Sequence, residues 1–95
     1  MDILKWLEEW YHSNCDGDWE HQYGIKINSL DNPGWEVVID LSEMSRNFDD
    51  IEYKLVENNE FDWIGYSLKD NVFRGVGDQW KLKKLIELFK SIIEN

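Results

Sequence analysis

Hydrophobic residues at the start of the chain recur with helical spacing. One stripe of residues 2–14 is apolar and consists of Ile3, Trp6, Leu7 and Trp10. The opposite side is polar and consists of Lys5, Glu8, Glu9 and His12. This spacing predicts an amphipathic helix that buries one face. The stretch CDGDW then ends the helix, because Gly17 can adopt positive φ and the flanking aspartates can bond back to the chain.

Alternation with a period of two follows and predicts a β-hairpin. Tyr23, Ile25 and Ile27 share one face of the first strand. In the stretch DNPGW, Pro33 and Gly34 suit the two central positions of a type II turn. The inward positions of the returning strand are Trp35, Val37, Ile39 and Leu41.

The middle of the chain predicts further strands after a polar connection over residues 42–50. Residues 51–55 alternate as a third strand, the stretch ENNE supplies turn residues, and residues 61–68 form a fourth strand. Bulky residues occupy both faces of that strand, so either both faces are covered or Trp63 is exposed. After the turn KDN, the short stretch VFRGVG is expected as a fifth strand at the edge of the sheet.

The last segment predicts a helix over about residues 80–94, with Asp78 as its N-cap. Its apolar stripe consists of Leu82, Leu85, Ile86, Phe89 and Ile93. The lysines expected to be solvated are Lys81, Lys83, Lys84 and Lys90. The order of elements predicts one α+β domain over residues 1–95: an antiparallel meander of four or five strands, flanked by an N-terminal and a C-terminal helix.

Charge narrows the classes of partner. Twenty acidic residues against ten basic ones give a formal net charge of -10. This charge opposes binding to nucleic acid or to an anionic membrane and favours a basic protein partner. Solubility alone is the alternative explanation. Residues 1–79 hold 18 of the 20 acidic residues, so we expect the partner-facing side before the last helix.

The chain's other general features predict a cytoplasmic protein. A single cysteine excludes an internal disulfide, the apolar runs are too short to cross a bilayer, and the first ten residues lack the pattern of a signal peptide. We expect a monomer or a weak homodimer, the latter if Trp63 is exposed on an uncovered sheet face.

Chemistry-bearing residues gather in the stretch CDGDWEH, residues 15–21. Cys15 and His21 would be the pair of a small cysteine-dependent enzyme, but the neighbouring carboxylates disfavour a thiolate through like charge. The same stretch matches a calcium loop only in part, and it offers too few soft ligands for zinc. We therefore expect no catalytic residue, no metal and no cofactor, and the enzyme using Cys15 and His21 remains the alternative.

The same stretch favours a surface that binds a protein over a catalytic or metal site. Aromatic side chains provide buried contact, and carboxylates steer a basic partner and pair with it. Trp19 lies between Asp18 and Glu20 in a predicted loop, so we expect it to be an exposed anchor. The predicted contact residues are Asp16, Asp18, Trp19 and Glu20, with Glu36 and Asp40 of the adjacent hairpin as second choices. An acidic interaction module that acts independently of any toxin is a further alternative.

Four stretches together resemble a known family. The order and spacing of LEEWY, CDGDWEHQYGIKI, LDNPGW and VFRGVGD are similar to the immunity protein 53 family of bacterial polymorphic toxin systems. The resemblance implies a protein that binds and neutralises the toxin encoded beside it. The matching positions outside the predicted contacts are Cys15, Gly17, His21, Asp31, Asn32, Pro33, Gly34 and Trp35. An acidic inhibitor suits a toxin with a basic substrate site, such as a nuclease.

Overall fold

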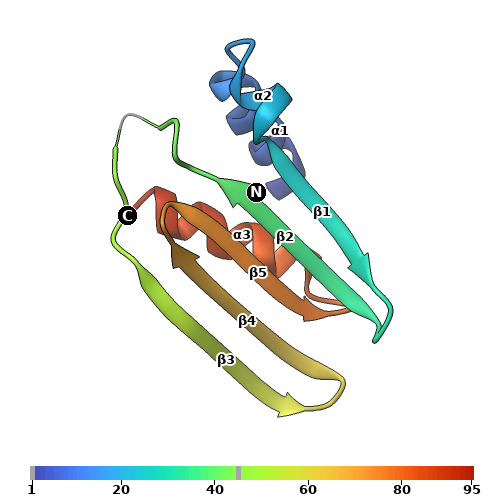
Figure 1. The fold of residues 1–95 in the computed structure, drawn as a ribbon. Coiled ribbons are helices and arrows are strands. Elements are labelled where there is room, and N and C mark those ends of the chain that lie inside the picture. The colour runs from blue at the N-terminus through green and yellow to red at the C-terminus, as the bar shows by residue number, and fades with distance from the viewer. Residues whose placement is uncertain (1, 45) are drawn as a thin grey trace.

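The computed structural model describes residues 2–44 and 46–95 and contains one five-stranded antiparallel sheet with helices (Figure 1). The strands are β1 (Ile25–Leu30), β2 (Gly34–Asp40), β3 (Ile51–Asn59), β4 (Asp62–Lys69) and β5 (Val72–Asp78). The helices are α1 (Ile3–Asn14), the single turn α2 (Trp19–Gln22) and α3 (Leu82–Ile93). The α+β class with an N-terminal and a C-terminal helix is therefore confirmed.

The order of the strands differs from a simple meander. The sheet runs β1-β2-β5-β4-β3, so β5 lies in the centre and not at the expected edge. Its residues explain this position, because Phe73 is fully buried and pairs with Ile39 of β2 and Leu68 of β4. Gly75 lets α3 approach closely, since a Cβ there would lie 2.8 Å from a methyl group of Leu85. Residues 41–50 carry the chain from β2 to the far edge as the expected polar connection, of which Ser45 lies outside the described residues.

Both long helices lie on the same side of the sheet. Helix α3 packs on β2 and β5 through its predicted apolar stripe, and α1 packs beside α3. In the part of the chain that the structure describes, the other sheet face carries no helix (Figure 1). None of the helices in residues 2–44 and 46–95 combines the length and apolarity needed to cross a membrane.

The helix ends correct one expectation. Asp2 caps α1, because its side chain accepts a hydrogen bond from the N–H of Lys5. Asp78 does not cap α3: it ends β5, and Lys81 occupies the N-cap position. The side chain of Asp78 is 3% exposed, and its carboxylate accepts a hydrogen bond from the ammonium group of Lys81. It is therefore held at the end of the sheet instead of capping the helix. Lys81 is consequently not solvated as expected.

Two turns show where glycine and asparagine are needed. Residues 31–33 join β1 to β2. Gly34 pairs with Leu30 as the first residue of β2, so the type II turn expected with Pro33 and Gly34 at its centre is wrong. Gly34 already belongs to β2, where a Cβ would lie 2.3 Å from the carbonyl oxygen of Gly77. Between β4 and β5, Asp70 and Asn71 have φ values of 52° and 64°, as a type I′ hairpin turn requires. Strand β3 extends to Asn59, through most of the predicted ENNE turn.

Candidate functional site

The first bend, residues 15–18 between α1 and α2, is held by the carboxylate of Asp16 and by that of Glu20 in α2. Asp16 Oδ1 accepts hydrogen bonds from the N–H groups of Asp18 and Trp19 at 2.9 and 3.0 Å. These hydrogen bonds hold the pKa of Asp16 below its usual value, and the bond from Trp19 contributes more than the bond from Asp18. Glu20 accepts from the N–H groups of Asp16 and Gly17 at 2.9 and 2.8 Å. Its own N–H contributes most to lowering the pKa of Glu20, and these two add to the effect.

Trp19 is part of the core, so its prediction as an exposed anchor is wrong. The side chain is 1% exposed, and its indole N–H donates to the carbonyl of Asp40 at 2.9 Å. The ring meets Trp10 edge-on at a centroid distance of 5.6 Å. The single turn α2 points the indole inward, where it fills the space between α1 and the end of β2.

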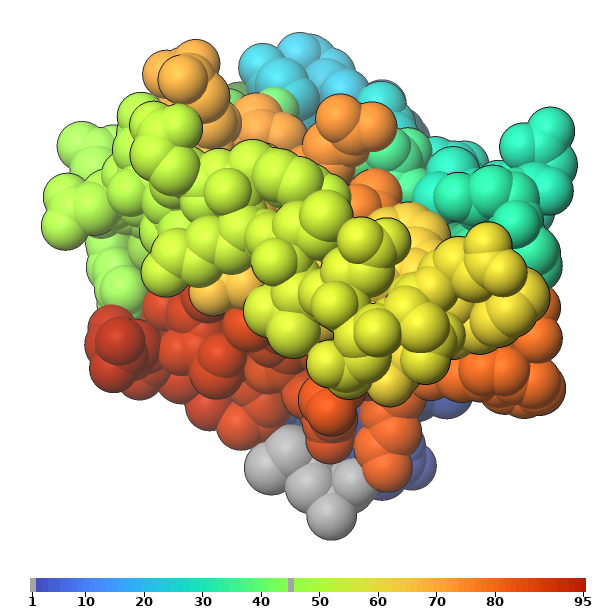
Figure 2. Space-filling view, turned by 90° about the horizontal axis from the view of Figure 1, so that it is seen from below, coloured from blue at the N-terminus to red at the C-terminus, as the bar shows by residue number. Residues whose placement is uncertain are grey.

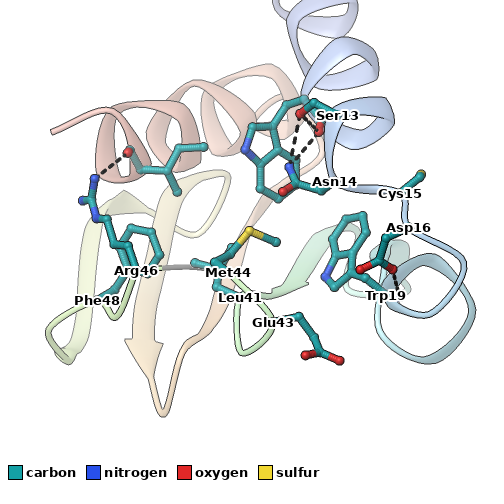
Figure 3. A pocket seen from close by; sticks show the side chains of 12 residues that line it. Ser13, Asn14, Cys15, Asp16, Trp19, Leu41, Glu43, Met44, Arg46 and Phe48 are labelled. Carbon is teal, nitrogen blue, oxygen red and sulfur yellow. Dashed lines mark hydrogen bonds between the residues drawn. The ribbon is translucent and has the colours of Figure 1, made fainter.

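A hollow of about 370 Å³ lies beside the bend, between the ends of α1 and α3 and the 41–48 connection (Figure 3). Trp19 and Leu41 supply apolar walls, and Asp16 and Glu43 supply carboxylates. Arg46 donates to the carbonyl oxygens of Ile93, the last residue of α3, and of Asn95. Its guanidinium lies 4.4 Å from the centre of the Phe48 ring. The hollow is therefore lined by both signs of charge and by apolar side chains.

The thiol of Cys15 forms a hydrogen bond to the backbone. Its Sγ donates to the carbonyl of Tyr11 at 3.2 Å, one helical turn earlier. His21 is exposed on α2, and within residues 2–44 and 46–95 the thiol has no hydrogen bond to an imidazole. Nor do these residues contain a group of three His, Cys, Asp or Glu side chains placed to hold a metal ion.

The structure does not gather all predicted contact residues in one place. Asp40 joins the bend region, where its carboxylate accepts hydrogen bonds from the N–H and the hydroxyl of Ser42. Glu36 lies nearer the start of β2, away from the bend, and pairs with Arg74. Its Oε2 lies 2.8 Å from Nε and 2.5 Å from a terminal guanidinium nitrogen of Arg74. Among the described residues, Asp18 is the one predicted contact carboxylate that accepts no hydrogen bond within the chain.

The predicted turn of the first hairpin lies at the other end of the sheet. Residues 31–33 are exposed, and Trp35 is half-buried with its indole N–H donating to the carbonyl of Gln79 at 3.0 Å. Beside this turn lie two aromatic side chains that are not among the predicted contact residues, Phe61 and Trp80. The helical and strand patterns assigned them to regular elements. Their position next to turn residues in the stretches ENNEF and GDQW is the signal that could have singled them out.

The described geometry is that of a small α+β protein whose predicted site offers binding groups rather than an assembled catalytic pair. A family model described as immunity protein 53 matches residues 4–94. The chain therefore belongs to the immunity protein 53 family, which supports a toxin-neutralising immunity role and implies a toxin as its partner. No curated protein and no solved structure matches the chain at a significant level.

Proposed function

We propose that this protein neutralises a secreted bacterial toxin in the cytoplasm by binding it directly, without bond-making chemistry of its own. Membership of the immunity protein 53 family is the observation that carries the proposal. The hydrogen bond of Cys15 to a backbone carbonyl supports the non-enzymatic part, because a nucleophilic thiol would need a base that takes its proton.

The charge of the chain supports a basic toxin surface as the target. With a net charge of -10, the protein attracts cationic surfaces over about 10 Å at 0.1 M salt and steers their approach. Nucleases are the toxin class that this charge fits best, since their substrate sites bind phosphate with basic residues. Covering such a site would block the substrate, and the acidic inhibitor would take the place of the polyanion.

The first bend remains a predicted contact surface, although the structure changes which residue tests it. Asp16, Glu20 and Asp40 each hold nearby backbone, so their removal perturbs the fold as well as any contact. Asp18 is exposed and free of such bonds in the described chain, which makes Asp18→Ala the clean variant for this surface.

The decisive experiment pairs the protein with the toxin domain encoded beside its gene. Co-expression should restore growth of cells that produce the toxin, and the purified proteins should form a stable complex. The association rate should fall steeply as ionic strength rises, because electrostatic steering is screened. Absence of both protection and complex would refute the proposal, and an acidic toxin or a toxin active site left open in the complex would refute its charge-based part.

A further inference from the structure

The end of the sheet opposite the first bend carries the two most exposed aromatic side chains in the described part of the chain. Trp80 is 79% exposed and Phe61 is 75% exposed. Both border a shallow hollow together with residues of the first hairpin turn. Figure 2 shows the turn (teal), the β3–β4 connection (yellow) and the residues after β5 (orange) meeting on the right of the view. We call this surface, residues 31–33, 60–61 and 79–80, the aromatic tip.

The backbone beneath Trp80 is held rigidly. Asp78, which is almost fully buried, accepts a hydrogen bond from the N–H of Trp80 at 2.8 Å and another from the N–H of Trp63 at 2.9 Å. The indole of Trp35 fixes the carbonyl of Gln79, the residue just before Trp80. A partner that docks on Trp80 would therefore meet a preformed surface, and little backbone order would be lost on binding.

The backbone beneath Phe61 is fixed in a similar way. The N–H of Phe61 donates to the side chain of Asn59 at 2.8 Å, and Asn58 donates to Asp62 at 3.0 Å across the same turn. The two exposed rings are thus presented by short, bonded connections at the end of a sheet. Exposed aromatic side chains that border one hollow on such a scaffold favour a site of interaction.

The charge around the tip is negative. Asp31 and Glu60 are exposed within it, and Glu57 and Asp62 lie beside it. In residues 31–34, 57–63 and 77–81 the one basic side chain is Lys81, which already pairs with two carboxylates. An aromatic centre with a polar rim is the usual anatomy of a protein interface, and this rim suits Lys and Arg side chains.

The size of the hollow separates a protein partner from a small ligand. Its volume is about 50 Å³, whereas small-molecule sites usually occupy roughly 300–1,000 Å³. The acidic rim also opposes nucleic acid and anionic lipid. A basic protein surface is the partner that this combination fits.

We infer that the aromatic tip is the anchor surface that holds the toxin. Trp80 and Phe61 pack against apolar side chains of a basic toxin face, while Asp31 and Glu60 pair with cations around it. This inference rests on the proposed function and adds to it the location of the contact.

The test measures binding of full-length variants to the purified toxin domain from the neighbouring gene. Trp80→Ala and Phe61→Ala should each raise the dissociation constant by about 30-fold or more, because each removes a central aromatic anchor. Tyr53→Ala is the matched control, because Tyr53 is an exposed aromatic on the same strand as Asn59 and about 20 Å along it. We expect this control to bind within about twofold of the unmodified protein.

Glu60→Lys gives a second measurement that does not depend on a large truncation. This exposed residue should leave the fold intact, and its reversal should lower the association rate several-fold at low salt. Thermal unfolding of each variant verifies that the fold is retained.

The outcomes distinguish the inference from the proposed function. Folded tip variants that bind like the unmodified protein would overturn the inference, while the binding itself would leave the proposed function standing. Weakening by Asp18→Ala alone would place the anchor at the first bend and would also overturn the inference. If the unmodified protein neither binds the toxin nor protects against it, both fail.

Discussion

The ammonium nitrogen of Lys81 lies 2.7 Å from Oδ2 of Asp78, a carboxylate at the buried end of β5. The same nitrogen lies 2.7 Å from Oδ1 of Asp62 at the start of β4. Gly77 makes this approach possible, because a Cβ there would lie 2.7 Å from the Cβ of Lys81. The charge network therefore ties the start of α3 to two neighbouring strands.

Lys81→Met should destabilise the protein by about 3 kcal/mol, because it leaves Asp78 buried without its cation. The measurement is urea unfolding at neutral pH. Lys83→Met is the matched control: Lys83 is exposed on the same helix, and its loss should change stability by less than about 0.5 kcal/mol. Equal stability of the two variants would show that the network contributes nothing.

Acid should weaken the same network. Burial by itself would raise the pKa of Asp78, but the hydrogen bonds from Lys81, Trp63 and Trp80 and the charge of Lys81 hold it below its usual value. The hydrogen bond from Lys81, followed by that from Asn58, lowers the pKa of Asp62.

Carboxylates with lowered pKa values bind fewer protons in the folded state, so their stabilisation is complete above the ordinary value of about 3.9 and is lost as pH falls below it. Urea unfolding between about pH 5 and 2 should show a decline in stability that is smaller in Lys81→Met. Identical pH profiles would contradict this assignment.

The two tryptophans Trp19 and Trp80 form a matched pair for stability. Trp19→Ala should cost about 3–5 kcal/mol, because it empties a core position and removes the donor to the carbonyl of Asp40. Trp80→Ala should change stability by less than about 0.5 kcal/mol, because the side chain is exposed. Chemical unfolding monitored by far-UV circular dichroism compares them, and a comparable loss in both would contradict the assigned burial.

Cys15→Ser should protect toxin-producing cells as well as the unmodified protein does. A serine hydroxyl can still donate to the carbonyl of Tyr11, and direct binding requires no thiol. Growth in the presence of the toxin is the measurement, with protein levels verified by immunoblot. Complete loss of protection by a folded variant would favour the cysteine-dependent enzyme instead.

Asp16→Ala should lower the melting temperature, whereas Asp18→Ala should leave it unchanged. The carboxylate of Asp16 accepts two hydrogen bonds from backbone N–H groups of the first bend, whereas the carboxylate of Asp18 accepts none in the described structure. Differential scanning fluorimetry of the two variants makes the comparison directly. If both variants melt like the unmodified protein, the bend does not depend on the Asp16 carboxylate.

The sequence by itself determined the elements that local periodicity encodes. The stripe of Ile3 and Leu7 defined α1, and the stripe of Leu85 and Phe89 defined α3. Of the predicted inward positions within β2, Val37 and Ile39 are fully buried in the core and Trp35 is half-buried. The family resemblance also came from the chain alone. The helices and the strand depend on residues three or four positions apart or on alternating positions, so the linear sequence contains their pattern.

Only the tertiary structure decided where β5, Trp19 and Trp80 lie. The pairing of β5 with β2 depends on a contact between distant segments, and Gly75 shows its reason only once α3 lies over it. Acidic neighbours made Trp19 look exposed, yet the turn of α2 directs it inward, while Trp80 stays outside because α3 begins after it. Burial depends on packing between segments that are far apart in the chain, which local sequence does not specify.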